Sequence, residues 1–421
     1  MKKIVLSLAS VLAATAFAPE ASAVPAFARQ TGMACTACHA QHFPVLNGFG
    51  RAFKAGGYTM MGSQGKVEGE HLSIPDTLNA SIVMKIRYQD DNTAGPVGPS
   101  DATGQTVGGG QWQFFDEFAL LFGGRVAENV GFLLEAQMNA TGPLAAGFKM
   151  PFVFDMGAAK LSVVPFQTDA LGVSYGYELS SGGVQRANRW AEHRREVSAI
   201  QYLANDGAGK GAATGITVAA QNDMGFVTLT KWAATQMNIS GGADMDSSYV
   251  RIAATPTLAG WATVIGLGKV SGASFAGSST GTKMDTDQTF FDLQAQGEVA
   301  GKEIGVYFQH AKAPAGDGVV NAYNGSICAV GTACNPDKKA TTIGVDYSVI
   351  PHVLSIGAAY RGADNGKASN VNGDDAWTVT AVYDLYQNVA LHANYSSYSG
   401  SAHNAAGAQK NLLTLMLEAS W

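Results

Sequence analysis

The chain has 421 residues and a formal net charge of -6, and charged residues make up 14% of it, well below the roughly 25% of soluble domains. Without a basic stripe interleaved with aromatic residues, a nucleic-acid partner is excluded. With 51 glycines and 46% hydrophobic residues, the composition is typical of a transmembrane β-barrel, whose apolar residues alternate along many strands. The longest uncharged stretch, residues 252–268, contains Pro256 and several glycines, so no transmembrane helix is expected there.

Residues 1–23 have the pattern of a secretory signal peptide. Lys2 and Lys3 precede an apolar run, and an A-x-A-like cleavage site ends at Ala23. An uncleaved anchor is the weaker interpretation, because Pro19 interrupts the apolar run before it is long enough to span a bilayer. We expect export, with a mature chain that starts at Val24.

A C-x-x-C-H motif follows at Cys35, Cys38 and His39. Two thiols at this spacing bond the vinyl groups of a haem, and the next residue presents its imidazole to the iron. A disulfide or half of a zinc site is the alternative, but no second C-x-x-C lies nearby to complete four zinc ligands. The motif predicts one covalently bound haem c, attached through Cys35 and Cys38 with His39 as proximal axial ligand.

Residues 24–75 are predicted to form a small α-helical cytochrome plug, near the size at which a domain needs a cofactor or partner to stay folded. Pro44 and the pair Gly56-Gly57 bracket a helix with Leu46, Phe49 and Phe53 on one face. That face is expected to cover the haem. Arg51 and Lys54 are candidates for pairing with the haem propionates, or else solvated surface charges. The haem-pocket candidates are therefore Phe49, Phe53 and Arg51.

The second axial ligand has to approach the opposite face of the haem. His42 is too close to His39 in sequence to reach it. Met60 follows the glycine pair and is the candidate distal ligand, with Met61 and His71 as alternatives. A Met/His pair raises the haem potential, which suits a weak electron donor.

Residues 76–421 are predicted to form an antiparallel outer-membrane β-barrel. Segments of about ten residues alternate between apolar and polar side chains and are separated by turn residues. The clearest span residues 77–88, 130–139, 377–386 and 412–421. A raw count of 17 candidate strands is odd, whereas such barrels have even numbers. We therefore expect 16 strands, with a non-strand segment between 152 and 196.

Loop lengths and the last residue predict the orientation of this barrel. Long connections lie near 272–288, 313–339, 363–376 and 400–411, and they alternate with short turns. Because such barrels have short periplasmic turns, the C-terminus is expected in the periplasm. The final strand ends on Trp421, and this closing aromatic resembles the terminal strand of bacterial outer-membrane proteins.

Two features of the loops have alternative interpretations. Cys328 and Cys334 share the longest outer loop, where an oxidising compartment favours a disulfide over metal binding. A basic cluster within residues 186–195 is either a solvated turn, which we favour, or a partner for haem propionates.

The run at residues 26–60 closely resembles the N-terminus of the fused monohaem cytochrome-porins of iron-oxidising bacteria, the outer-membrane iron oxidases. Cys35, Cys38 and His39 match the haem motif of that family. The resemblance implies oxidation of extracellular Fe(II), with the electron passed through the haem to a periplasmic cytochrome c or other carrier. It transfers neither a distal ligand nor an Fe(II) site, so the Fe(II) site is unknown.

Two other functions fit the same sequence. The protein is otherwise an electron conduit for another donor or in the outward direction, or a passive solute porin with an appended cytochrome. Conductance separates the last from the others, because a plugged barrel passes little solute.

Overall fold

The structure is a computed structural model that describes residues 25–93, 110–138, 145–180, 197–204, 211–236, 244–275, 283–328 and 337–421. The predicted signal peptide and the basic cluster at 186–195 lie outside these residues, as do Cys334 and the side chain of Cys328, so the predicted disulfide is not described.

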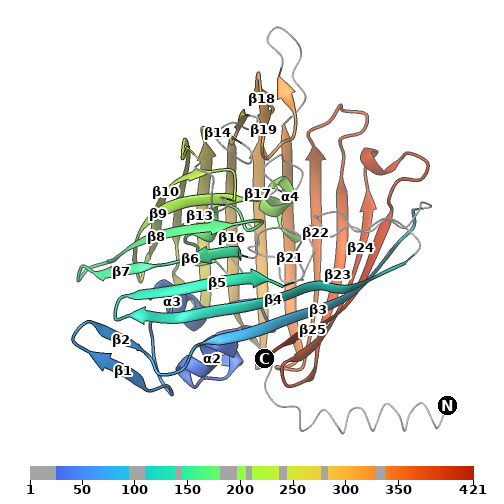
Figure 1. The fold of residues 1–421 in the computed structure, drawn as a ribbon. Helices are drawn as coiled ribbons and strands as arrows, with labels where there is room; N and C mark the ends of the chain where they lie inside the picture. Colours follow the sequence, from blue (N-terminus) through green and yellow to red (C-terminus); the bar gives the residue numbers. More distant parts are fainter. Residues whose placement is uncertain are drawn as a thin grey trace, which may run out of the picture.

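The N-terminal part of the described chain is a small helical plug. It contains α2 (Pro25–Thr31), the short 3-10 helix η1 (Cys35–Ala37) and α3 (Gly48–Ala55). A hairpin of β1 (Lys66–Gly69) and β2 (Leu72–Pro75) then leads to the barrel. Figure 1 shows α2 and α3 at the same end of the barrel as the C-terminus.

The strands after this plug form one closed antiparallel barrel. Its first half contains β3 (Ala80–Asp91), β4 (Gln111–Ala127), β5 (Val130–Gln137), β6 (Ala145–Lys149), β7 (Phe152–Asp155), β8 (Lys160–Thr168), β9 (Ala213–Asn222) and β10 (Gly225–Ala233). Its second half contains β11 (Ser247–Ala254), β12 (Thr257–Leu258), β13 (Trp261–Ser271), β16 (Gln288–Val299), β17 (Lys302–Ala313), β21 (Lys338–Ile350), β22 (Leu354–Asn365), β23 (Asp375–Tyr386), β24 (Val389–Ser399) and β25 (Asn411–Ser420).

Two of these strands are interrupted by proline, which cannot donate a hydrogen bond to the sheet. Strands β6 and β7 flank Pro151 and both pair with β5 and β8. Strands β11 and β12 flank Pro256 and both pair with β13. Each pair is one interrupted strand, so the described barrel has 16 strands. The predicted antiparallel barrel and its 16 strands are confirmed, whereas the haem of the plug stays a prediction.

Side chains alternate across the barrel wall with the polarity of a membrane protein. On β23, Trp377 and Val379 face outward and are exposed, whereas Thr378 and Thr380 face the lumen and are buried. The same alternation holds on β3, where Lys85 and the inward residues beside it are buried. An apolar outer surface over a polar inner one is what a lipid-facing barrel requires.

The barrel closes through its first and last strands. Strand β25 pairs with β3, and beyond the last paired residue the backbones of Trp421 and Ile82 exchange two hydrogen bonds, at 3.0 and 2.8 Å. The terminal aromatic is thus held at the seam of the barrel.

A segment without strands folds into the lumen where the sequence predicted one. Residues 169–180 contain only the 3-10 helix η2 (Val173–Tyr175), and α4 (Ala199–Ala204) lies within the barrel beside β17 and β21. Glu178 accepts a bond of 3.1 Å from the buried Arg251, which also pairs with Asp292. Val173 and α4 join a large apolar cluster that narrows the described lumen.

Short strands extend the barrel at the end opposite the plug. They are β14 (Ala273–Phe275), β15 (Lys283–Asp285), β18 (Gly316–Asp317), β19 (Val320–Asn321) and β20 (Ile327–Cys328), and they form two small sheets. The tight turns, near residues 259, 300, 351 and 387, lie at the plug end. Among the described helices, none has both the length and the hydropathy to cross a bilayer.

Candidate functional site

The C-x-x-C-H motif forms a single tight turn. Helix η1 begins at Cys35, whose carbonyl accepts hydrogen bonds from the backbone N–H groups of Cys38 and His39 at 3.1 and 3.0 Å. Both cysteines are half-buried. This turn brings the two thiols and the imidazole together from adjacent positions in sequence.

Asn47 and Gly50 join this turn to helix α3. The side chain of Asn47 caps the helix by accepting from the N–H of Gly50 at 2.9 Å, and its amide donates to the carbonyl of Ala37 at 3.1 Å. The Asn47 backbone N–H donates to the carbonyl of Cys38 at 3.0 Å. The backbone of Gly50 lies so near Cys38 that a Cβ there would sit 2.2 Å from the same carbonyl oxygen. The helix and the motif are therefore positioned as one unit.

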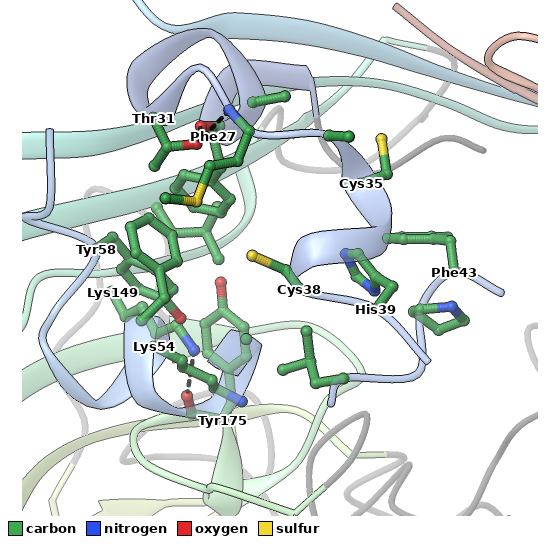
Figure 2. Close-up of a pocket in the computed structure, with 18 of the residues that line it drawn as sticks. Phe27, Thr31, Cys35, Cys38, His39, Phe43, Lys54, Tyr58, Lys149 and Tyr175 are labelled. Atoms are coloured by element: carbon green, nitrogen blue, oxygen red, sulfur yellow. Dashed lines mark hydrogen bonds between the residues drawn. The ribbon is translucent and has the colours of Figure 1, made fainter. Parts of the chain in front are cut away.

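The motif opens onto a cavity of about 290 Å³ with mostly apolar walls. From the plug, Phe27, Phe53 and Tyr58 line it as a cluster in which the Phe27 and Tyr58 rings stack at 5.0 Å. From the barrel and its inner segment, Leu133 and Tyr175 complete it. In Figure 2, Cys35, Cys38 and His39 lie along one side of the cavity, and Tyr58, Lys149 and Lys54 along the other.

The donor set of this cavity fits a haem c. Burial lowers the pKa of His39 to about 4, so its imidazole is neutral near pH 7 and has a lone pair for a metal. Its Nδ1 is buried and has no hydrogen-bond partner among the described residues. Burial raises the pKa of the Cys38 thiol, so this cysteine is not a preformed thiolate. Two cysteines at this spacing, a neutral imidazole and apolar walls fit a covalently bound haem.

Two lysines lie at the cavity without an acidic partner. Lys149, on β6, is 4% exposed; its Nζ donates to the carbonyl of Tyr175 at 3.1 Å and lies 4.4 Å from the centre of the Tyr175 ring. Lys54, on α3, is half-buried, and burial lowers the pKa of its ammonium, partly opposed by Glu178. Neither lysine forms an ion pair with a carboxylate in the described part of the chain. Sequence reasoning missed Lys149, because nothing local distinguishes it from other strand lysines.

The structure corrects two of the three haem-pocket candidates. Phe53 lines the cavity, as predicted, but Phe49 is 41% exposed and lines a separate cavity. Arg51 donates to Gln296 at 2.5 Å and to the carbonyl of Leu46 at 3.2 Å, facing the barrel wall away from the cavity. The helix begins only at Gly48, so Leu46 precedes it, but Leu46 lines the cavity as predicted, together with residues 50, 53 and 54.

The candidate distal ligand Met60 is also placed elsewhere. The left-handed conformations of Gly57 and Tyr58 (φ 70° and 63°) turn the chain, and Tyr58 fills the wall of the cavity. Met60 then lines the same separate cavity as Phe49, with its carbonyl bonded to Gln30 at 2.8 Å. Met33, two residues before the motif, lines the cavity at the motif.

The other two histidines of the plug lie outside the cavity. His71 is on the exposed turn of the β1–β2 hairpin. His42 is buried against the barrel wall, where its Nδ1 is 2.6 Å from the carbonyl of Phe43 and its Nε2 is 3.1 Å from Asp346. Since a carbonyl only accepts, Nδ1 carries a proton, and the contact with the carboxylate places a second proton on Nε2. Burial lowers the pKa of His42 and is the largest single effect. The charge and hydrogen bond of Asp346, the hydrogen bond with the Phe43 carbonyl and the charge of Asp384 together outweigh it, so the net shift is upward.

The comparisons with known proteins found similarity in architecture alone. No family model and no curated protein matches the chain. Among solved structures, the outer membrane channel DcaP of Acinetobacter baumannii is 12% identical, with 82% of this chain and 97% of that chain covered and a TM-score of 0.48. The outer-membrane expressed OmpT of Vibrio cholerae is 12% identical, with 85% and 100% covered and a TM-score of 0.43. The strand pairing of the chain itself, rather than this likeness, defines the fold.

Among the described residues, no group of three or more His, Cys, Asp or Glu side chains is arranged to hold a metal ion. We therefore assign no residue to Fe(II).

Proposed function

We propose that the protein is an outer-membrane cytochrome-barrel that oxidises extracellular Fe(II) and passes the electron to a periplasmic carrier such as a cytochrome c. In enzymatic terms it is an iron:cytochrome c oxidoreductase with one covalently bound haem c. The observation that carries this proposal is the cavity at the C-x-x-C-H motif, which has two half-buried cysteines, a neutral buried imidazole and walls contributed by the barrel.

The barrel supports the location. Its outer surface is apolar, as contact with outer-membrane lipid requires. The plug and the C-terminus share the end with the tight turns, which we assign to the periplasm, where haem is attached and a soluble carrier is available.

The separation of extracellular Fe(II) oxidation from periplasmic electron transfer follows from the chemistry of iron. Oxidation of one Fe(II) releases one electron and yields Fe(III), which precipitates near neutral pH, so a cell gains by oxidising it outside. A bound haem supplies the one-electron couple. The chain's own residues hold it at the plug end, exclude water with Phe27, Phe53 and Tyr58, and present the neutral His39. The choice of Fe(II) as donor rests on the resemblance at residues 26–60.

Anaerobic mixing tests the proposal. Fe(II) near neutral pH should reduce the purified oxidised protein quickly with no other component present, and sulfide or thiosulfate at comparable concentration should act more slowly. In intact cells, an Fe(II) chelate too large to cross the outer membrane should still reduce the protein. If only another donor reduces it, an electron conduit for that donor is the better function.

A passive porin is the second candidate, and the lumen argues against it. Residues 169–180 and α4 fill part of the described lumen with apolar and ion-paired side chains. We expect low single-channel conductance in planar bilayers. Conductance like that of an open porin, together with a haem that Fe(II) leaves oxidised, would favour the porin.

A further inference from the structure

We propose that Lys54 of the plug and Lys149 of the barrel wall bind the two propionates of the haem, so that the cofactor joins the plug to the barrel. This inference rests on the proposed haem site and adds its anionic end, to which the barrel contributes.

The first step is the electrostatic state of Lys149. An ammonium at 4% exposure has lost most of its hydration, and it receives only one carbonyl and the faces of Tyr175 and Tyr58 in return. Buried charges are ordinarily paired, since an unpaired one is costly. A buried ammonium without an anion is costly and tends to lose its proton, so a charged Lys149 requires an anion within reach of the amine.

The second step is the number and placement of the charges. Lys54 faces the same cavity from helix α3, and the two ammonium groups repel each other. The two propionate carboxylates of a haem lie together at one edge of the macrocycle, away from both thioether bonds. With the thiols of Cys35 and Cys38 along one side of the cavity, the propionate edge extends toward the side that holds the two lysines (Figure 2).

The third step excludes Arg51, the other plug cation that was a candidate for the propionates. Arg51 is engaged by Gln296 and the carbonyl of Leu46 and lines a different cavity. Lys149 is placed instead by the barrel, through its pairing opposite Leu133 on β5 and Phe166 on β8. The binding site for the propionates thus requires a folded barrel as well as a folded plug.

The experiment compares Lys149→Met, Lys54→Met and Lys149→Arg in the full-length haem protein. Lys338→Met is the matched control, because Lys338 is also a buried barrel lysine, 3.4 Å from the Leu203 carbonyl and 4.8 Å from the Tyr202 ring, but lies outside the cavity. Haem per chain is measured first, since the cysteines, not the lysines, hold the haem covalently. The midpoint potential and the propionate bending band in resonance Raman spectra are then measured on each variant.

Both Lys→Met changes should shift the propionate band and lower the midpoint potential, because a positive charge nearby favours the reduced, less positive haem. Lys149→Arg should restore both values toward wild type, and Lys338→Met should change neither. In the haem-free double variant Cys35→Ala, Cys38→Ala, adding Lys149→Met should raise the thermal stability of the barrel, since there it removes an uncompensated charge.

If the protein carries one haem per chain but neither the midpoint potential nor the propionate band changes in the Lys54 and Lys149 variants, this inference is overturned and the proposed function is left intact. A wild-type protein without haem would overturn both together. A stability loss from Lys149→Met in the haem-free protein would show that this ammonium already has a partner, and would also overturn the inference.

Discussion

Replacement of Gly50 by alanine tests whether helix α3 and the C-x-x-C-H turn form one rigid unit. A Cβ at position 50 would lie 2.2 Å from the carbonyl oxygen of Cys38 and 3.0 Å from its carbonyl carbon. Both atoms belong to the backbone, so the helix or the motif has to move. Alanine is otherwise favoured over glycine in a helix interior by about 1 kcal/mol.

The expected size of the effect follows from these two opposing contributions. Overpacking costs about 1 to 3 kcal/mol, and the upper end applies where the obstructing atoms are backbone. Gly50→Ala should therefore destabilise the plug by about 2 kcal/mol net, or roughly 30-fold in its unfolding equilibrium. The measurement is denaturant unfolding of the plug followed by haem absorption, with protease cleavage of the plug as a readout independent of haem.

Gly48→Ala is the matched control on the same helix. Its new Cβ would meet only Ala262 Cβ, at 3.9 Å, and Arg51 Nη2, at 4.0 Å, which are ordinary contacts. It should be neutral or slightly stabilising. If Gly50→Ala and Gly48→Ala unfold at the same denaturant concentration, the close packing of the motif on the helix is refuted.

Three further predictions concern the distal ligand, the barrel seam and the plug. If Met33 is the distal ligand, Met33→Ala should lower the midpoint potential of the haem and open the iron to external ligands, whereas Met60→Ala should do neither. Redox titration and cyanide binding measure these changes, and the opposite result would favour Met60 as the distal ligand. Deletion of Trp421 should lower the yield of inserted barrel in cell fractions without affecting haem attachment, because it removes the two backbone bonds to Ile82, and a normal yield would contradict this. The pKa of His42 is raised in the folded protein. Its pairing with Asp346 therefore stabilises the plug fully at pH values below the unfolded-state pKa of about 6.5, and this stabilisation is lost as the pH rises through the folded-state pKa. Protease protection of the plug should accordingly fall with rising pH, and Asp346→Asn should remove that dependence; equal dependence in both proteins would argue against the pair.

The barrel was largely predictable because its signal is local and repeated. Trp377 and Val379 alternate with Thr378 and Thr380, and one such segment is enough to define both faces of a strand. The two interrupted strands were harder to predict. Pro151 divides one of them, and its two halves are recognised as one strand only because both pair with the same neighbouring strands. The grouping of Cys35, Cys38 and His39 in one turn was also predictable, because the three residues lie within five positions, and the haem itself stays a prediction.

The rest of the site was not predictable because it depends on where the chain turns and on long-range pairing. The glycine pair correctly marked the end of the helix, but the left-handed Tyr58 directs Met60 away from the cavity. Lys149 is 95 positions from Lys54, and its inward orientation is fixed only by the register of β6 against β5 and β8. No periodicity within the plug carries that information.

The closure of β25 onto β3 sets an order of assembly. The plug immediately precedes β3, and the last strand to leave the ribosome is the one that seals the cylinder beside it. In the folded protein, Leu133, Lys149 and Tyr175 line the cavity beside the motif, so a haem is expected to enter it before the barrel closes. We therefore predict that attachment of the proposed haem is completed while the C-terminal strand is still unpaired. A cell that delays haem delivery would then accumulate chains that have lost the chance to receive it.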